Sequence, residues 1–459
     1  MNILLRGGTV VSAINAKKQD VLISGSKIVK VGRFISDKNA QVVDVSGKLI
    51  FPGFIDAHTH FDLEVSDTVT ADDFESGTRA AVCGGTTTII DFATQNKGES
   101  LSTALNNWHL KAFAKSSCDY AFHMAVSDFN DGIKEELPAM FEQGVSSFKA
   151  YMTYDAMMLN DEDLFSLLSS LKDMGTIVGV HCENHGIIKS LTKKYTDNNA
   201  MSVSTHPKVR PSIVEAEAVG RLLSIAMVVD VPVVIVHLSS KESLEVVEHY
   251  RQKGCKVYVE TCPQYLLLDD SRYDLKGLEG AKYVCSPPLR KKDDSKALWK
   301  AIKAGAVQTV ATDHCSFTLE QKNVGLEDFS KMPNGMPGVE TRGVLLYTYG
   351  VCKKRISIEQ MCRVLCENPA KLYGMYPKKG VIKAGSDADI VVLDPKTDGF
   401  ISKNTHHSKA DYNPYEGVRT KGKVATVYLR GKKVVENGEL ILENKGKYVN
   451  RDKNMLDEP

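Results

Sequence analysis

Short stretches in which apolar and polar residues alternate make up the first fifty residues of the chain. They cover residues 2–5, 20–23, 27–31 and 40–44, and glycines separate them. A period of two is typical of strands with one buried face, and glycine supplies the turns between such strands. Antiparallel strands and turns are therefore predicted for this part of the chain.

From Phe54 onward the pattern changes to apolar runs of strand length that alternate with longer amphipathic segments. The predicted strands are residues 54–58, 86–92, 120–126, 147–152, 176–181, 233–238, 256–261 and 307–312. Helical spacing is clearest at residues 161–174, 212–228 and 293–303. Eight strand–helix units in succession predict a (β/α)8 TIM-like barrel in the α/β class.

Alternation returns after Tyr373, at residues 389–393, 424–429 and 432–442. Neither end of the chain has enough short strands for a core of its own, so we expect the two ends to form one smaller β-sandwich domain. The predicted division is residues 1–50 and 376–445 for the two parts of the β-domain and 51–375 for the barrel. The charged residues 446–459 are predicted to be a C-terminal arm or tail.

Composition narrows the range of functions. Of 459 residues, 42% are hydrophobic, which is ample for a large core, and the formal net charge is +1. A balanced charge gives no field that would attract nucleic acid or an anionic membrane, and no apolar stretch approaches the length of a membrane span. The ten cysteines include no C-x-x-C pair. We therefore expect a cytoplasmic protein with reduced thiols and a small-molecule partner.

Residues with metal-binding side chains recur where the predicted strands end. His58 and His60 lie one residue apart at the first strand, so both project from the same face. His181 and His237 end the fifth and sixth strands, and Asp313 follows the eighth. Each alone could be an ordinary packing residue, the role we assign to His109, His123 and His249. Because barrel enzymes place their sites at this rim, the group together predicts a metal centre.

Lys149 lies inside the fourth predicted strand, among apolar neighbours. An unpaired ammonium is costly there, and desolvation favours the neutral amine. A neutral amine can react with CO2 to form a carbamate, an anion able to bridge two cations. The alternative, which the spacing alone favours, is a salt-bridged or snorkelling lysine.

Several motifs resemble those of the cyclic amidases in the amidohydrolase superfamily, and their order is most similar to dihydropyrimidinases and D-hydantoinases. The main motifs are His58-Thr59-His60, Ser147-Phe148-Lys149, Tyr151-Met152-Thr153-Tyr154, His181-Cys182-Glu183-Asn184, Val236-His237-Leu238-Ser239 and Ala311-Thr312-Asp313-His314-Cys315. Further matches lie at residues 68–74, 260–265, 286–290, 333–335 and 411–414. The resemblance covers nearly the whole chain.

The resemblance implies two divalent metal ions, with Zn²⁺ expected and manganese or cobalt as alternatives. It implies that His58 and His60 bind the more buried ion and His181 and His237 the second. Carboxylated Lys149 (N6-carboxylysine, formed with CO2) would bridge the ions, and Asp313 would complete the first site. Two cations about 3.5–4 Å apart make hydroxide available near neutral pH.

The same resemblance assigns roles to residues around the metals. Asp313 would act as general base and then general acid, and the Tyr154 hydroxyl would stabilise the oxyanion. Ser286 and Asn334 would hold the ring of the substrate largely through backbone atoms, although their sequences alone indicate only turns. A homotetramer, or a homodimer, is implied.

The leading hypothesis is a metal-dependent hydrolase that opens a cyclic ureide, a dihydropyrimidine or 5-substituted hydantoin, to an N-carbamoyl amino acid. Allantoinase and dihydroorotase activities are alternatives, and a non-enzymatic assembly protein of the same fold is a third. The segment 61–67 is more acidic than the family pattern predicts, with Glu64 and Asp67. Relatives use this loop to contact the ring substituent, so the preferred side chain and enantiomer of the substrate stay open.

Overall fold

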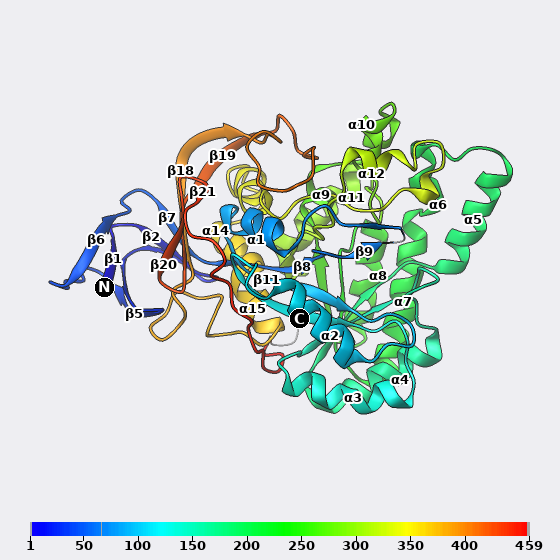
Figure 1. The fold of residues 1–459 in the computed structure, drawn as a ribbon, viewed down its shortest axis with the longest axis horizontal. Coiled ribbons are helices and arrows are strands. Elements are labelled where there is room, and N and C mark those ends of the chain that lie inside the picture. Colours follow the sequence, from blue (N-terminus) through cyan, green and yellow to red (C-terminus); the bar gives the residue numbers. More distant parts are fainter. Residues whose placement is uncertain (1, 66, 457–459) are drawn as a thin grey trace.

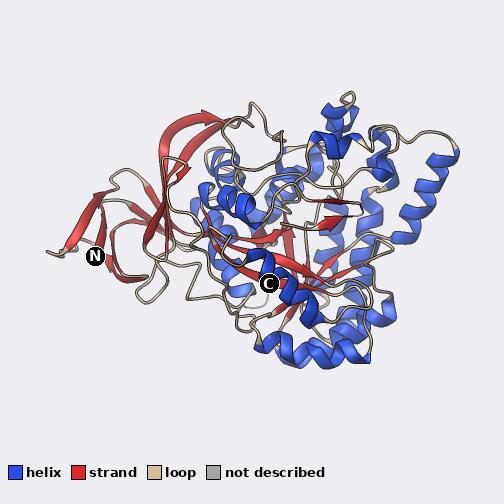
Figure 2. Ribbon diagram, in the orientation of Figure 1, coloured by secondary structure: helices blue, strands red, loops and turns tan. Residues whose placement is uncertain are grey.

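A parallel sheet of eight strands forms the centre of the larger part of the molecule (Figures 1 and 2). The computed structural model describes residues 2–65 and 67–456. The strands pair in chain order: β8 Phe54–Thr59, β11 Thr86–Thr94, β12 Asp119–Ala125, β13 Ser147–Tyr151, β14 Ile177–His181, β15 Val233–Ile235, β16 Val257–Thr261 and β17 Thr309–Val310. The predicted barrel is confirmed, and strands 233–238 and 307–312 are shorter than expected.

Helices surround this sheet on the outside (Figure 2). They are α1 Phe74–Cys83, α2 Leu101–Ala112, α3 Asp131–Glu142, α4 Asp161–Leu171, α5 His185–Asp197, α6 His206–Val209, α7 Ser212–Val229, α8 Lys241–Gln252, α9 Pro263–Leu267, α10 Leu278–Ala281, α11 Lys292–Ala304, α12 Leu319–Asn323, α13 Arg342–Leu345, α14 Ile358–Cys362 and α15 Asn368–Leu372. Side chains that accept a backbone N–H fix several helix starts, as Asp73 does for α1 and Ser100 for α2. Within the described part, no helix is long and apolar enough to cross a membrane.

A buried arginine closes the barrel between its first and last strands. Arg342 donates to the carbonyls of Ile55 on β8 and Val310 on β17, at 2.8 and 2.9 Å. The Asp56 carboxylate on β8 also accepts from the backbone N–H and hydroxyl of Thr312. These side chains satisfy backbone groups that a strand ladder would otherwise pair, which explains how β17 can be only two residues long.

Two sheets form the smaller part of the molecule, on the left of Figure 1. One contains β1 Asn2–Arg6, β4 Asp20–Ser24, β5 Lys27–Gly32 and β6 Ala40–Asp44. The other joins both ends of the chain: β2 Thr9–Val11, β3 Ala16–Lys18, β7 Leu49–Pro52, β18 Ile390–Phe400, β19 Arg419–Leu429, β20 Lys432–Glu436 and β21 Glu439–Leu440. A shared core of Val21, Ile50 and Ile390 lies between the sheets, and the predicted β-sandwich from both termini is confirmed.

Lys379 connects the barrel to this β-domain. Its side chain is 2% exposed, and Nζ lies 2.7 Å from Asp119 at the start of β12 and 2.5 Å from Asp389 just before β18. Asp387 lies 3.4 Å from the same nitrogen. One buried cation therefore pairs with carboxylates from both parts of the molecule, and Arg430 and Lys27 add a second partner to Asp119 and Asp387, respectively.

Residues 446–456 lie across the amino ends of the barrel strands. The backbone N–H of Val449 donates to Tyr120 and that of Asn454 to Gly175, at 2.8 and 3.1 Å. Arg451 is buried, and its guanidinium donates to the Ser147 hydroxyl on β13 at 2.6 Å. The last described residues thus cover the end of the barrel opposite the strand carboxyl ends.

Candidate metal-dependent active site

The carboxyl ends of β8 and β17 bring His58, His60 and Asp313 together. The Nε2 atoms of His58 and His60 each lie 3.2 Å from Asp313 Oδ1. One ligand atom from each residue lies within 4.8 Å of the others, which is a spacing that one metal ion can span. Asp313 has a positive φ of 53°, so the backbone leaves the strand direction at the residue that faces the histidines.

His181 and His237 lie beside this group. Their ring centroids are 4.6 Å apart, and the His237 ring is 5.3 Å from that of His58. His181 ends β14 as expected, whereas His237 lies two residues beyond β15. The φ of His237 is 40°, a left-handed conformation that cannot continue a strand and that explains the shorter β15.

Carboxylates hold two of the histidine rings from behind. Glu260 Oε1 lies 2.7 Å from His58 Nδ1, and Glu183 Oε2 lies 2.7 Å from His181 Nε2. Metal-binding histidines commonly donate their second ring N–H to such a carboxylate, which orients the ring and fixes the tautomer. This leaves Nε2 of His58 and Nδ1 of His181 free to bind a metal, and burial lowers the pKa of both imidazoles, which favours the neutral form that binds metal.

Arg210 supports the Glu183 carboxylate. The guanidinium lies 2.5 Å from Glu183 Oε2. Burial alone would raise the pKa of Glu183, but Arg210 and His181 outweigh burial and lower the pKa to about 2. Glu183 is therefore ionised and can hold His181 in one tautomer.

Lys149 is buried on β13 next to the histidines. Its Nζ lies 5.3 Å from the centre of the Phe92 ring and 5.1 Å from that of Tyr151. Across residues 2–65 and 67–456, no carboxylate lies within ion-pair distance of this nitrogen. Burial lowers the pKa of Lys149 to about 8, although Asp313 and Glu260 act in the opposite direction. The alternative of a salt-bridged lysine therefore lacks a partner anion among the described residues.

Tyr154 reaches the same space from the segment after β13. Its ring centre is 5.3 Å from that of His181, and the Arg210 guanidinium lies 5.5 Å from the ring. The φ of Tyr154 is 75°, which is uncommon for a bulky residue and is typical of strained backbone at functional sites. Burial raises the pKa of the hydroxyl to about 12, so it stays protonated and able to donate.

Ser286 and Asn334 lie on two irregular segments near these groups. The Ser286 Oγ and Asn334 Oδ1 atoms are buried without a hydrogen-bond partner. Asn334 precedes Gly335, whose backbone packs against Cys315, two residues beyond Asp313. Polar atoms left open near a group of metal-binding side chains are suited to contact a polar ligand.

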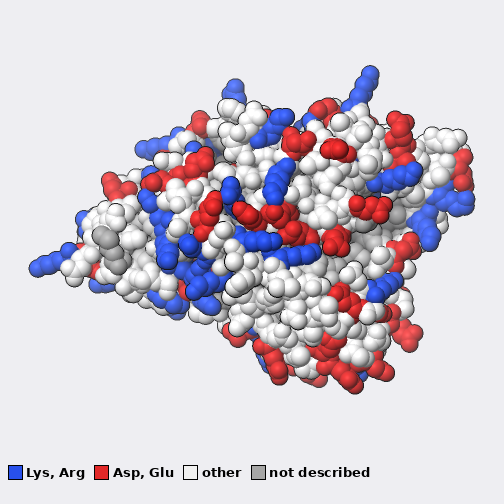
Figure 3. Space-filling view, viewed as in Figure 1, with Lys and Arg blue, Asp and Glu red and all other residues white. Residues whose placement is uncertain are grey.

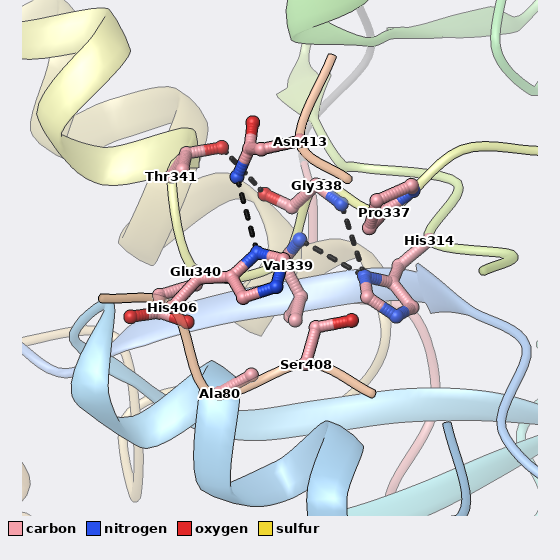
Figure 4. A pocket seen from close by; sticks show the side chains of 10 residues that line it. All are labelled: Ala80, His314, Pro337, Gly338, Val339, Glu340, Thr341, His406, Ser408 and Asn413. Atoms are coloured by element: carbon pink, nitrogen blue, oxygen red, sulfur yellow. Dashed lines mark hydrogen bonds between the residues drawn. The ribbon is translucent and has the colours of Figure 1, made fainter. Parts of the chain in front are cut away.

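His314 follows Asp313 and lines a pocket together with Gly338, Val339 and Ser408 (Figure 4). Its Nδ1 accepts the backbone N–H groups of Gly338 and Val339, and its Nε2 lies 3.0 Å from Asp72 Oδ2. Both ring nitrogens are therefore occupied. The ring anchors the residue next to Asp313 rather than offering a ligand.

The sequence-based prediction had no role for Glu183, Glu260, Arg210 or Asp72. Glu260 could have been noticed as a lone carboxylate within a predicted buried strand, because such a group needs a partner. Arg210 directly follows the short helix α6 and carries no such signal.

Comparison with known proteins decides the family. The model of the amidohydrolase family matches residues 49–434. The chain belongs to the amidohydrolase family. Its sequence is 43% identical over 457 residues to a D-hydantoinase of Geobacillus stearothermophilus, covering 99% of this chain and 97% of that protein.

Solved structures agree with this membership and with the predicted resemblance. A dihydropyrimidinase from Brevibacillus agri superposes with a TM-score of 0.97 at 43% identity, covering 99% of each chain. An L-hydantoinase from Arthrobacter aurescens superposes with a TM-score of 0.89 at 28% identity, covering 98% of this chain and 99% of that one. This amidohydrolase therefore has relatives whose names carry opposite enantiomer preferences.

Proposed function

We propose that this amidohydrolase opens the ring amide of a cyclic ureide, a dihydropyrimidine or a 5-substituted hydantoin, to give an N-carbamoyl amino acid. The supporting observation is the convergence of His58, His60, His181, His237 and Asp313 around buried Lys149. Relatives named D-hydantoinase and dihydropyrimidinase match nearly the whole chain, which favours this substrate class over other amidohydrolase reactions.

The donor set fits two divalent cations. His58, His60 and Asp313 would hold one ion, His181 and His237 the other, and carboxylated Lys149 would bridge them, with CO2 supplying the carbamate. Neutral imidazoles and a carboxylate suit Zn²⁺, the ion we expect. Two such cations, when bound, lower the pKa of a shared water and polarise a carbonyl group.

We assign the proton transfer to Asp313. Its carboxylate is 12% exposed, and Oδ1 lies 3.2 Å from Nε2 of both His58 and His60, which supports this role. We assign to this carboxylate the removal of a proton from the attacking water and its return to the leaving ring nitrogen.

We assign to Tyr154 the stabilisation of negative charge on the attacked carbonyl oxygen. Its hydroxyl stays protonated near neutral pH and can donate to that oxygen as charge develops. Ser286 and Asn334 would hold the rest of the ring. Their side-chain oxygens are buried on the adjacent segments without a hydrogen-bond partner, which supports this role.

Steady-state kinetics with a panel of rings tests the proposed substrate class. We expect the highest kcat/KM for dihydrouracil, hydantoin or a 5-substituted hydantoin, and much lower values for allantoin and dihydroorotate. Preferential turnover of allantoin or dihydroorotate would assign a sister activity. No turnover of any ring by protein that contains two metal ions per chain would contradict the proposal.

Replacing Lys149 tests the bridging carbamate. Lys149→Ala should lose most of its metal and activity, and short carboxylic acids should restore part of both because they can supply the missing bridge. Metal analysis and mass spectrometry of the intact protein under mild conditions provide the readout. Full metal retention by Lys149→Ala, without added acid, would rule out the carbamate bridge.

We also propose a homotetramer in the cytoplasm. Leu110 and Phe113, at the end of α2, are 75% and 74% exposed, and Val228 at the end of α7 is 76% exposed. Large apolar side chains at this exposure favour burial against another subunit. All ten cysteines are free thiols, which suits a reducing compartment. Sedimentation velocity measures the assembly, and a monomer at micromolar concentration would contradict it.

A further inference from the structure

Lys322, on α12, is a fully buried cation that the proposed mechanism does not use. Its Nζ donates to the backbone carbonyls of Val284 and Pro333, each at 2.8 Å. Within residues 2–65 and 67–456, no carboxylate lies within ion-pair distance of this nitrogen. A lysine side chain is costly to bury, so its position calls for a specific explanation.

The hydrogen bonds of Lys322 do not depend on its charge. Burial lowers the pKa of this amine to about 7. An ammonium has three N–H donors and a neutral amine has two, so both carbonyls can be satisfied in either form. The neighbouring titratable groups are the thiols of Cys285 and Cys315, whose pKa values burial raises, so they stay neutral.

The two carbonyls that accept from Lys322, those of Val284 and Pro333, belong to the segments that carry Ser286 and Asn334. In a trans peptide the C=O and the N–H point in opposite directions. Because the Pro333 carbonyl points toward Lys322, the Asn334 N–H in the same peptide group points away from it. Among the described residues, no protein acceptor takes this N–H.

His206, which begins α6, binds a backbone carbonyl of the segment that carries Ser286. Its Nε2 lies 2.8 Å from the Cys285 carbonyl, and because a carbonyl only accepts, Nε2 carries the proton. The Ser286 N–H lies in the same peptide group and likewise has no protein acceptor in the described part of the chain. The rings of Tyr273 and Phe329, each 5.7 Å from that of His206, hold the imidazole in place.

A further contact sets the distance between the segments. The Gly335 N–H donates to the Val284 carbonyl at 2.9 Å, so this carbonyl accepts from both Gly335 and Lys322. The segments around Ser286 and Asn334 are therefore tied to each other and to one buried amine.

We propose that Lys322 and His206 are positioning residues that aim the N–H groups of Asn334 and Ser286 at the second carbonyl of the substrate ring, the one that is not attacked. Two convergent N–H donors select a ring with an acceptor at that position, such as a ureide or an imide, over a simple lactam. This inference rests on the proposed function.

Replacing the second carbonyl oxygen by sulfur tests the assignment. The wild-type kcat/KM should favour hydantoin over 2-thiohydantoin, because sulfur accepts hydrogen bonds poorly. In Lys322→Met this preference should shrink about three- to tenfold, the value of one hydrogen bond, with metal content unchanged. The intrinsic reactivity of the two rings cancels when the ratios are compared between variants.

Two control variants separate positioning from general damage. Lys172 also donates to a backbone carbonyl, that of Val229, but lies at the amino ends of the barrel strands. Lys172→Met should keep the wild-type ratio. For the second segment, His206→Phe should reduce the preference for oxygen, and His206→Gln, which keeps a donor, should restore part of it. An unchanged ratio in both Lys322→Met and His206→Phe would overturn the proposal.

Hydrogen exchange distinguishes failure of this inference from failure of the proposed function. If metal-loaded wild-type protein opens neither ring, the proposed function fails while the positioning role can still be measured. Lys322→Met should speed amide exchange within residues 284–286 and 334–336, and Lys172→Met should not. Wild-type exchange rates at both segments of Lys322→Met would show that the lysine does not hold them. If Lys322→Met does not fold, the His206→Phe and His206→Gln variants test the inference through the same two measurements, the kcat/KM ratio and the amide exchange rates.

Discussion

At the scale of single residues, the two nitrogens of the His58 ring and of the His181 ring have different surroundings. His58 and His181 each hydrogen-bond to a carboxylate through one nitrogen, which leaves the other nitrogen free for the metal ion that we propose. The carboxylates differ in their own support, because Arg210 lies against Glu183 whereas Glu260 lies deep in the barrel. Ring orientation is thus fixed before any metal binds.

Asp313→Asn separates proton transfer from shape. The amide is similar in size but cannot accept the proton, so kcat should fall at least ~10²-fold. Rates are to be measured on protein with its metal content verified, because some metal loss is expected. Metal-replete Asp313→Asn with a nearly wild-type kcat would remove the assigned role.

Tyr154→Phe removes one hydroxyl and leaves the aromatic ring. If the hydroxyl bonds most strongly to the developing oxyanion, kcat should fall ~10²- to 10³-fold while metal content stays the same. A change confined to KM would instead make Tyr154 a residue that binds substrate and transition state equally.

The sequence predicts residues that end strands better than residues that support them. His58, His60, His181 and Asp313 lie at or next to strand ends, where the barrel geometry gives them a common location. Lys322 and Arg210 act through contacts with distant segments, on backbone carbonyls or on a buried carboxylate. Such contacts depend on loop conformation, which no local period encodes.

At the scale of elements, the segment after β8 forms a small hairpin. Strands β9 Glu64–Val65 and β10 Thr68–Val69 pair antiparallel, and the Glu64 side chain is exposed. Ser66, between them, lies outside the described residues. The unusual acidic segment thus contains a short antiparallel pair of strands, and its contribution to specificity stays a prediction.

Exchanging residues 63–67 for a segment that contains Pro, Phe and Gly tests this hairpin. Removal of Glu64 should favour bulky apolar substituents, since a poorly solvated charge beside them costs about 1–3 kcal/mol. The kcat/KM for aryl hydantoins should rise relative to dihydrouracil. An unchanged ratio, in a variant that still binds both metals, would place the determinant elsewhere, for example around Tyr151 and Met157.

Secondary structure was predictable where the periodic pattern of apolar and polar residues extended over enough residues. All eight barrel strands were expected, but β15 and β17 end early. His237 turns left-handed after β15, and Arg342 replaces backbone pairing at β17. The expected run 432–442 is a hairpin of β20 and β21 that turns at Asn437 and Gly438, both with positive φ. A side chain that replaces hydrogen bonds between strands is a tertiary effect, which strand propensity cannot show.

At the scale of the whole molecule, basic and acidic side chains are interspersed over the face shown in Figure 3, in keeping with the net charge of +1. The charged side chains that we expect to matter most for stability lie inside the protein. Lys379 is buried where the barrel meets the β-domain, and its three aspartates come from both.

Lys379→Met should destabilise the protein by roughly 3–5 kcal/mol, because it removes the cation shared by three buried carboxylates and takes from Asp389 the ion-pair partner that the structure gives it. Lys27→Met is the control: Lys27 pairs with Asp387 but is 46% exposed, so its loss should cost less than about 1 kcal/mol. Urea unfolding followed by circular dichroism measures both. Equal stability of the two variants would mean that the junction charge does not hold the domains together.

The sheet shared by both ends of the chain has a consequence for synthesis on the ribosome. β7 emerges early, yet its antiparallel neighbour β18 begins more than three hundred residues later, at Ile390. During most of translation the nascent chain therefore carries a half-built sheet with an open edge, which is prone to pair with other chains. This exposure ends when β18 emerges and pairs with β7, and residues 446–456 reach the barrel later still.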